Sequence, residues 1–236
     1  MGFFVDGVWQ EDTPANRFDR VGRFVRTPSV YRNWITEDGR PGPSGEGGFA
    51  AAPGRYHLYV SHSCPWAYRT TLFRALKKLE DAISITIAAP HYGEKSWRFA
   101  DEPGAGLDTV NGAQELTDVY LLANPKYSGR VTVPTLWDKE RKTIVNNESS
   151  EIIRMLNSAF RRFTPDTADY YPEPLRAEID QINELVYTTV NNGVYRCGFA
   201  TSQEAYEEAC RALFRTLDTL EERLSRQRWL VDKQIT

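Results

Sequence analysis

One cysteine of this chain stands at the junction between an expected strand and an expected helix. Cys64 follows the apolar run at 56–60 and precedes Pro65, which opens a helical pattern that continues to Glu80. Proline suits the first position of a helix, because its missing N–H would have no partner there. The unsatisfied N–H groups and the positive end of the helix dipole favour a thiolate over a thiol. Cys64 is therefore expected to be a nucleophile rather than an inert, buried thiol, the commoner fate of a free cysteine.

The chain offers no resolving cysteine near this thiol, because Ala67 occupies the second position of a Cys-x-x-Cys pair. A reactive thiol without such a partner must be resolved by a molecule from solution, which favours glutathione chemistry. Two further cysteines are interpreted as structural, Cys197 in a loop between helices and Cys210 on a helix face. An odd number of cysteines without a secretory signal favours a reducing compartment, so the expected location is cytoplasmic.

Bulk composition limits the class of protein. A chain of 236 residues with 41% hydrophobic and 26% charged residues is typical of a soluble protein with one or two domains. The net charge of −3 gives no electrostatic footprint for nucleic acid, and no apolar run approaches the length that spans a membrane. The three histidines and three cysteines are scattered, so no metal site is expected.

Periodicity divides the chain into three parts. Residues 1–54 show no convincing periodic element and are expected to form an irregular extension, whose aromatic residues suggest that much of it lies on a globular body. Residues 55–164 are expected to form one domain and residues 173–236 a helical domain, with a proline-rich linker between them. Three arginines interleaved with the aromatic residues of the extension are interpreted as solvated charges: Arg23, Arg26 and Arg32.

The order of elements predicts the fold class. Strands are expected at 56–60, 82–89, 133–137 and 143–147. Helices are expected at 65–80, around 114–122, and at 150–163. The first helix connects two parallel strands in a right-handed βαβ unit, and the last two strands form a hairpin. This βαβ-ββα order is that of a thioredoxin-like α/β domain, and an all-α part follows, with long helices near 175–191 and 203–227.

Val133-Pro134 stands at the head of the third expected strand. Proline at this place is compatible with an ordinary edge position. In thioredoxin-like folds a cis proline here faces the helix-start cysteine, and the backbone of the preceding residue pairs with a peptide-like ligand. The sequence alone leaves both interpretations open.

Glu148 and Ser149 stand where the next helix begins, and an ordinary helix cap is the simplest interpretation. A serine at a helix N-terminus also offers its hydroxyl and N–H groups to a carboxylate, and an adjacent glutamate can meet an ammonium group. The γ-glutamyl end of glutathione presents both charges, so the pair also fits that ligand.

Three further side chains stand out. Trp97 lies in the irregular segment 90–130, where it is interpreted as an anchor that holds the loop to the core. Arg130 is either a surface charge or a partner for the other carboxylate of the tripeptide. Tyr195 is either a half-buried packing residue or a phenol directed at the cysteine.

Four motifs occur in the chain in a characteristic order. They are Ser63-Cys64-Pro65-Trp66-Ala67, Gly129-Arg130-Val131-Thr132-Val133-Pro134, Asn146-Asn147-Glu148-Ser149-Ser150-Glu151 and Asn191-Asn192-Gly193-Val194-Tyr195-Arg196. Together they closely resemble those of the glutathionyl-hydroquinone reductases, the Xi-class, omega-like branch of the glutathione transferases. The resemblance covers essentially the whole chain.

The resemblance implies a thioredoxin-like domain, a helical domain and, in the full-length family member, a homodimer. It implies that Cys64 attacks the sulfur of a glutathionyl-hydroquinone, releases the hydroquinone and forms a mixed disulfide, which a second glutathione converts to oxidised glutathione. Glutathione is then a co-substrate, with no permanently bound cofactor, and Tyr195 donates a proton to the leaving aromatic carbon or orients it. The residues implied to hold glutathione are Trp97, Arg130, Val131, Thr132, Val133, Pro134, Glu148 and Ser149.

The family's helical domain is longer, and Ile235-Thr236 resembles the opening of another helix, so this domain is expected to be partial here. Two alternatives stay open. One is an omega-type thioltransferase or dehydroascorbate reductase that uses Cys64 with a different acceptor. The other is a non-enzymatic, glutathione-transferase-like binding module. Trp66 and Tyr195 favour an enzyme, because a scaffold has no need of an activated thiol.

Overall fold

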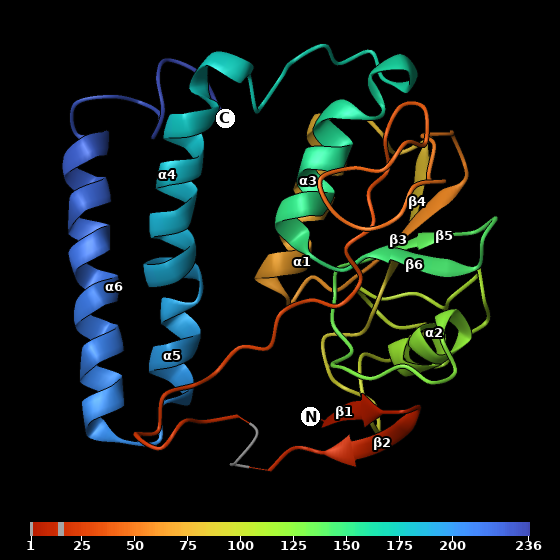
Figure 1. The fold of residues 1–236 in the computed structure, drawn as a ribbon, viewed down its shortest axis with the longest axis horizontal. Helices are drawn as coiled ribbons and strands as arrows, with labels where there is room; N and C mark the ends of the chain where they lie inside the picture. Colours follow the sequence, from red (N-terminus) through yellow and green to blue (C-terminus); the bar gives the residue numbers. More distant parts are fainter. Residues whose placement is uncertain (1, 14–16) are drawn as a thin grey trace. The chain divides into compact units, whose positions relative to one another are not determined.

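The computed structural model describes residues 2–13 and 17–236, which divide into two units (Figure 1). The first unit comprises the described residues of Met1–Glu11 together with Pro28–Ala168. The second comprises the described residues of Asp12–Thr27 together with Asp169–Thr236. The segment expected to form one extension is thus shared between the two units.

A four-stranded mixed sheet with the strand order β4-β3-β5-β6 forms the centre of the first unit. Strand β3 (Tyr56–Val60) is parallel to β4 (Ile83–Ile87) and antiparallel to β5 (Thr135–Asp138). Strand β6 (Thr143–Asn146) is antiparallel to β5. Every residue of β3 is buried, as expected for a strand that is covered on both faces. The predicted thioredoxin-like fold class is confirmed.

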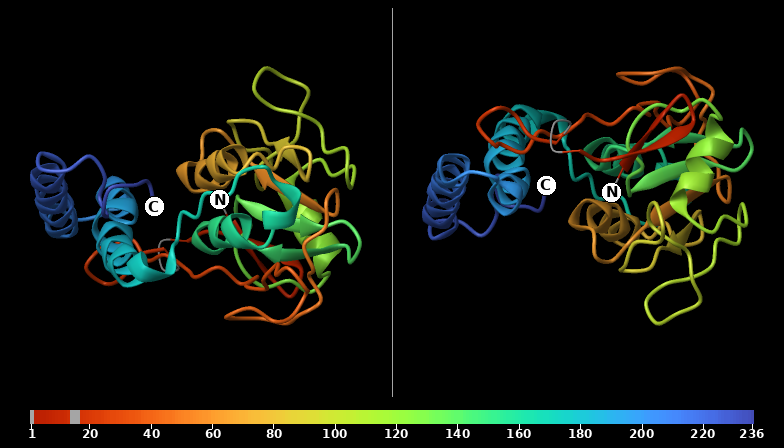
Figure 2. Two further views of the ribbon diagram at one scale, coloured as in Figure 1. Left: turned by 90° about the horizontal axis from the view of Figure 1, so that it is seen from above. Right: turned by 90° about the horizontal axis from the view of Figure 1, so that it is seen from below.

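Helices cover both faces of this sheet. Helices α1 (Pro65–Leu76) and α3 (Ser149–Ser158) pack side by side on one face, and α2 (Leu116–Ala123) lies on the other (Figures 1 and 2). The helix expected over 150–163 is shorter, because it ends at Ser158 and only a 3₁₀ turn at Arg161–Phe163 follows. The apolar face of α3 is buried against the sheet, and it consists of Ile152, Ile153, Met155 and Leu156.

The expectation of an irregular N-terminal extension is wrong at its start. Strands β1 (Gly2–Val5) and β2 (Val8–Glu11) form an antiparallel hairpin. Both residues of its turn, Asp6 and Gly7, have positive φ angles of 47° and 79°. A type I′ turn requires this conformation, and Asp-Gly is one of the pairs that adopt it most readily. The Asp-Gly pair between two short apolar runs was the signal that the sequence analysis overlooked.

The second unit is helical. Its elements follow one another along the chain and lie in two adjacent columns in Figure 1, with α6 beside the others. They are α4 (Arg176–Val186), a π-helical turn (Tyr187–Asn191), α5 (Gly193–Phe199) and α6 (Gln203–Leu224). No helix within the described ranges is both long enough and apolar enough to cross a membrane.

The loop position expected for Cys197 is wrong, because this residue lies inside α5. The helix expected near 175–191 does not end in a loop, because the π-helical turn at its end continues directly into α5. Cys210 lies on α6, as expected.

Two arginines that were expected to be solvated charges make defined contacts in this unit. Arg23 donates from Nε to Glu208 Oε2 on α6 at 2.9 Å. The Arg26 guanidinium carbon lies 5.6 Å from the ring centroid of Tyr195 on α5. The segment at 17–27 is therefore fastened to the helices rather than merely hydrated.

The buried imidazole of His57 in β3 makes folding sensitive to pH. Burial lowers the pKa of His57 to about 4, and its two ring nitrogens lie 2.7 Å from Ser84 Oγ and 3.0 Å from Thr86 Oγ1. An unfolded chain binds a proton at this residue near pH 6.5. Protonation of the unfolded chain therefore does not oppose folding above pH 6.5. Below that pH the free energy of unfolding falls, until the pH reaches the pKa of about 4 in the folded state.

We expect this group to lower the free energy of unfolding by about 2 kcal/mol between pH 7 and pH 5. The His57→Gln variant, whose amide cannot titrate, should lack that share of the pH dependence, whatever its overall stability. Urea unfolding of both proteins at the two pH values measures the difference. An identical pH dependence in the two proteins would contradict the prediction.

Candidate functional site

Strand directions bring three segments to one edge of the sheet. Because β5 is antiparallel to β3, the last residues of β3 pair with the first residue of β5. The segment before β5, which contains Val133, therefore lies beside the segment after β3, which contains Cys64. Strand β6 is antiparallel to β5 and ends at Asn146, so Glu148 also follows at this edge.

Cys64 immediately precedes α1 in an extended conformation, with φ −103° and ψ 112°, and Pro65 is the first residue of the helix, as predicted. The thiol is partly buried, and its Sγ atom lies 3.6 Å from the carbonyl oxygen of Val133. The Val133–Pro134 peptide bond is cis. The structure thus brings together the two motifs that the sequence analysis identified independently.

Glu148 is the N-cap of α3, and its Oε1 atom accepts hydrogen bonds from the N–H of Ser150 at 3.3 Å and from its hydroxyl at 3.1 Å. Ser149 is the first residue of the helix and is only 2% exposed. Its hydroxyl accepts a hydrogen bond from Arg69 Nη1 at 3.1 Å. The N–H of a residue at this position has no partner inside its own helix. Glu148 therefore caps the helix, as expected, and the N–H and hydroxyl groups of Ser149 are suited to bind an anion.

Arg69, on α1, is a residue that the sequence analysis missed. It lies five positions after Cys64, in the second turn of α1, and its contact with Ser149 joins that turn to the first residue of α3. Sequence spacing gave no sign of this contact, because the two residues are separated by 80 positions.

The segment before the cis proline is held from two sides. Strand β1 contributes two backbone hydrogen bonds of 2.9 Å to Gly129. The Arg130 guanidinium carbon lies 5.8 Å from the centroid of the Phe3 ring. Val131 is partly buried against the core, and the Thr132 N–H donates to Tyr120 Oη at 3.3 Å. The N-terminal hairpin therefore supports the segment that carries four of the candidate ligand-binding residues.

Trp97 is 8% exposed and packs within the core, which agrees with its structural interpretation as an anchor. The loop before it is held by Glu115, whose carboxylate accepts the N–H groups of residues 94, 95 and 96 at 2.6, 3.1 and 3.0 Å. The carbonyl of Trp97 accepts the N–H of Leu116 at 2.8 Å. Glu115 is another residue whose role the sequence analysis did not foresee.

Tyr195 belongs to the second unit, while the other candidate residues all belong to the first. It is half-buried on α5, and its ring lies 6.1 Å from that of Phe199, one turn later. In the same unit, burial raises the pKa of the Cys197 thiol, and its neighbour Cys210 adds to that effect. Within residues 2–13 and 17–236, no cluster of three or more histidine, cysteine or acidic side chains is placed to hold a metal ion.

A thioredoxin-like domain followed by a helical unit defines the class of the glutathione transferases, and here a cysteine precedes the first helix of that domain. The family model described as "Glutathione S-transferase, N-terminal domain" matches residues 63–159. The chain belongs to the glutathionyl-hydroquinone reductases, the Xi class of this superfamily, as the following relatives show.

The chain is 52% identical to glutathionyl-hydroquinone reductase YqjG of Escherichia coli, over 100% of its own length and 72% of that protein. It is 50% identical to glutathionyl-hydroquinone reductase PcpF of Sphingobium chlorophenolicum, with the same coverage. The glutathione-bound structure of YqjG matches with a TM-score of 0.89, covering 100% of this chain and 70% of that one at 49% identity. Glutathione S-transferase Xi of Phanerochaete chrysosporium matches with a TM-score of 0.87, covering 93% and 69% at 49% identity. The resemblance that the four motifs indicated is confirmed.

The different surroundings of the cysteines predict different reactivity. Cys64 stands at a helix N-terminus, which favours its thiolate, whereas burial raises the pKa of Cys197. Iodoacetamide near neutral pH should therefore modify Cys64 at least about tenfold faster than Cys197. Time-resolved peptide mass spectrometry measures both rates, and the urea-unfolded chain, in which the thiols are equivalent, is the control. Faster modification of Cys197 in the folded protein would contradict the assignment of Cys64 as the activated thiol.

Proposed function

We propose that this protein reduces glutathionyl-hydroquinones to hydroquinones, with glutathione as its co-substrate and Cys64 as its nucleophile. The observation that carries this proposal is the 3.6 Å separation between Cys64 Sγ and the Val133 carbonyl, at the edge where α3 begins. Two relatives of about half-identical sequence are named glutathionyl-hydroquinone reductases, and one of them is known as a glutathione-bound structure.

The geometry suits glutathione as a peptide ligand. Val133 precedes β5, so its peptide groups lie outside the sheet ladder and can pair with the cysteinyl residue of glutathione, whose sulfur then faces Cys64. The γ-glutamyl carboxylate would bind the hydroxyl and N–H of Ser149, and the γ-glutamyl ammonium would bind Glu148. Arg130 would bind the glycyl carboxylate. The remaining proposed contacts are those of Trp97, Val131, Thr132 and Pro134.

The reaction then proceeds by two exchanges at sulfur. The Cys64 thiolate attacks the glutathionyl sulfur, the bond from that sulfur to the aromatic carbon breaks, and the carbon takes the electron pair. A proton reaches this carbon, with Tyr195 as the proposed donor, and the hydroquinone leaves. The thiolate of a second glutathione attacks the glutathione sulfur of the mixed disulfide, which releases oxidised glutathione and restores the Cys64 thiolate. Two electrons pass from two glutathione sulfurs to the ring carbon.

Family membership supports two further proposals, a homodimeric assembly and a cytoplasmic location. Light scattering after gel filtration tests the first, and microscopy of a fluorescent fusion in the source cell tests the second.

Replacement of the nucleophile tests the proposed function directly. We expect Cys64→Ser to lower release of hydroquinone from a glutathionyl-hydroquinone at least about 100-fold. Affinity for glutathione should change less than about threefold, because the hydroxyl replaces only the sulfur. Cys210→Ser is the matched control and should keep full turnover.

The other outcomes each point elsewhere. Undiminished turnover in Cys64→Ser would contradict the proposal and indicate a tyrosine- or serine-type transferase. Reduction of dehydroascorbate by the wild-type protein without turnover of the glutathionyl-hydroquinone would favour the omega-type alternative. Glutathione binding without turnover of either substrate would favour a non-enzymatic module.

A further inference from the structure

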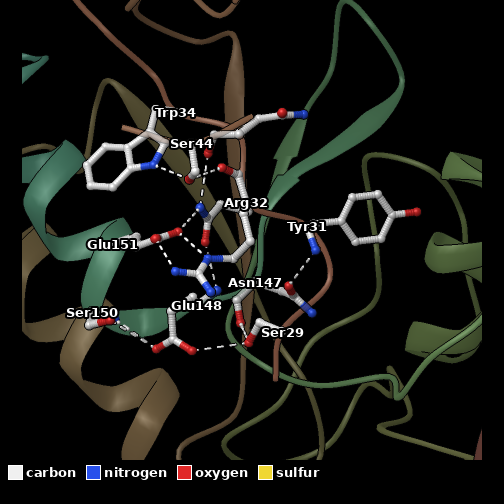
Figure 3. Close-up of polar contacts among 11 residues, drawn as sticks. Ser29, Tyr31, Arg32, Trp34, Ser44, Asn147, Glu148, Ser150 and Glu151 are labelled. Atoms are coloured by element: carbon white, nitrogen blue, oxygen red, sulfur yellow. Dashed lines mark hydrogen bonds and ion pairs between the residues drawn. The ribbon is translucent and has the colours of Figure 1, made fainter. Parts of the chain in front are cut away.

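A serine of the N-terminal segment contacts the carboxylate of Glu148. The Ser29 Oγ atom lies 3.1 Å from Glu148 Oε2 and 3.2 Å from the carbonyl oxygen of Asn147 (Figure 3). The hydroxyl has one proton for these two acceptors, and the charged carboxylate is the stronger acceptor. Ser29 is separated from Glu148 by 119 positions, so this contact is a product of the fold.

The two oxygens of Glu148 are held from different directions. Ser150 donates to Oε1 with both its N–H and its hydroxyl, and Ser29 donates to Oε2. A carboxylate oxygen can accept about two hydrogen bonds, so Oε2 has a further position for an ammonium group. Fixing a glutamate side chain in one orientation costs conformational entropy. Because the fold already holds this side chain in place, ligand binding does not lose that entropy again.

Ser29 is itself held in place by its neighbour Tyr31. The Tyr31 N–H donates to Asn147 Oδ1 at 3.1 Å, and the Asn147 N–H donates to the Tyr31 carbonyl at 3.1 Å. The Tyr31 ring stacks on that of Tyr127, with centroids 5.5 Å apart and planes inclined by 14°. The segment is thus fixed by a two-way contact with the residue directly before Glu148.

The two acidic residues at the start of α3, Glu148 and Glu151, have different partners. Arg32 contacts both carboxylate oxygens of Glu151, with 2.7 Å between Nε and Oε2. The expectation that Arg32 is a solvated charge is therefore wrong. Asn146 Nδ2 also donates to Glu151 Oε2 at 2.7 Å (Figure 3). Glu151 is paired with a cation of the protein, whereas the donors to Glu148 among the described residues, Ser29 and Ser150, are neutral, so a cationic ligand group can pair with Glu148.

We propose that Ser29 is a positioning residue for recognition of the glutathione amino group, and that it acts by orienting Glu148. This inference rests on the proposed function, because it takes glutathione as the ligand of Glu148. Ser29 contacts neither the thiol nor the reacting sulfur, so its effect falls on binding and on discrimination between ligands rather than on the chemical steps.

A ligand that lacks the amino group provides the test. Isothermal titration calorimetry of the full chain compares glutathione with its deamino analogue, in which a glutaryl group replaces the γ-glutamyl group. We expect Ser29→Ala to weaken glutathione binding roughly 3- to 10-fold and to change binding of the analogue less than about twofold. Ser29→Thr, which keeps the hydroxyl, should restore the preference for glutathione.

Ser44→Ala is the matched control. Its hydroxyl donates to the Arg32 carbonyl at 2.7 Å and accepts from Trp34 Nε1 at 2.9 Å, in the same segment but away from Glu148 (Figure 3). This variant should keep the preference of the wild type. An equal loss for both ligands in Ser29→Ala, or the same loss of preference in Ser44→Ala, would show a general structural role and overturn the inference.

Glu148→Gln separates this inference from the proposed function. If Glu148→Gln abolishes the preference for the amino group while Ser29→Ala retains it, the role of Ser29 is refuted and the binding role of Glu148 stands. If the wild-type chain does not bind glutathione, or if Glu148→Gln keeps the preference, the assignment of Glu148 fails and the inference about Ser29 fails with it.

Discussion

The antiparallel pairing of β3 with β5 decides where the thiol meets the backbone opposite it. The pairs run from Tyr56 and Asp138 to Tyr59 and Thr135, and every one of these residues is buried. A slip of one residue would turn each side chain to the other face of the sheet and disrupt the packing on both faces, so the packing fixes the register. Cys64 lies four residues after β3 and Val133 lies two residues before β5, and the pairing of these strands holds the two residues next to each other.

The same arrangement places two helix starts at one edge of the sheet. Helix α1 begins directly after Cys64, and α3 begins directly after Glu148. Each start has unsatisfied N–H groups and the positive end of a helix dipole. One of them favours a thiolate and the other a carboxylate, and the contact between Arg69 and Ser149 joins the two. The proposed reaction at sulfur and the proposed binding of an anionic peptide therefore depend on the same physical feature, the start of a helix.

Most of the fold and the centre of the candidate site could be predicted from local sequence patterns. The apolar run at 56–60, the proline after Cys64 and the serine after Glu148 each signal an element boundary from the residues next to it, and the structure has all three boundaries there. The turn at Asp6-Gly7 could also have been predicted, because it depends only on these two residues. The contacts that support the start of α3 could not be predicted. Ser29, Arg32 and Arg69 act on α3 across 80 to 119 positions, and periodicity says nothing about pairs so far apart. For the same reason, Arg32 was interpreted as a solvated charge.

The most direct test of Cys64 as the nucleophile is the intact mass of the protein after it meets its substrate. The chain is incubated with a glutathionyl-hydroquinone in the absence of free glutathione, and the adduct is located by peptide mapping. We expect one glutathionyl group on each chain, attached to Cys64, and its loss when glutathione is added. Release of hydroquinone with Cys64 left unmodified, or a glutathionyl group on Cys197 or Cys210 instead, would contradict the central claim.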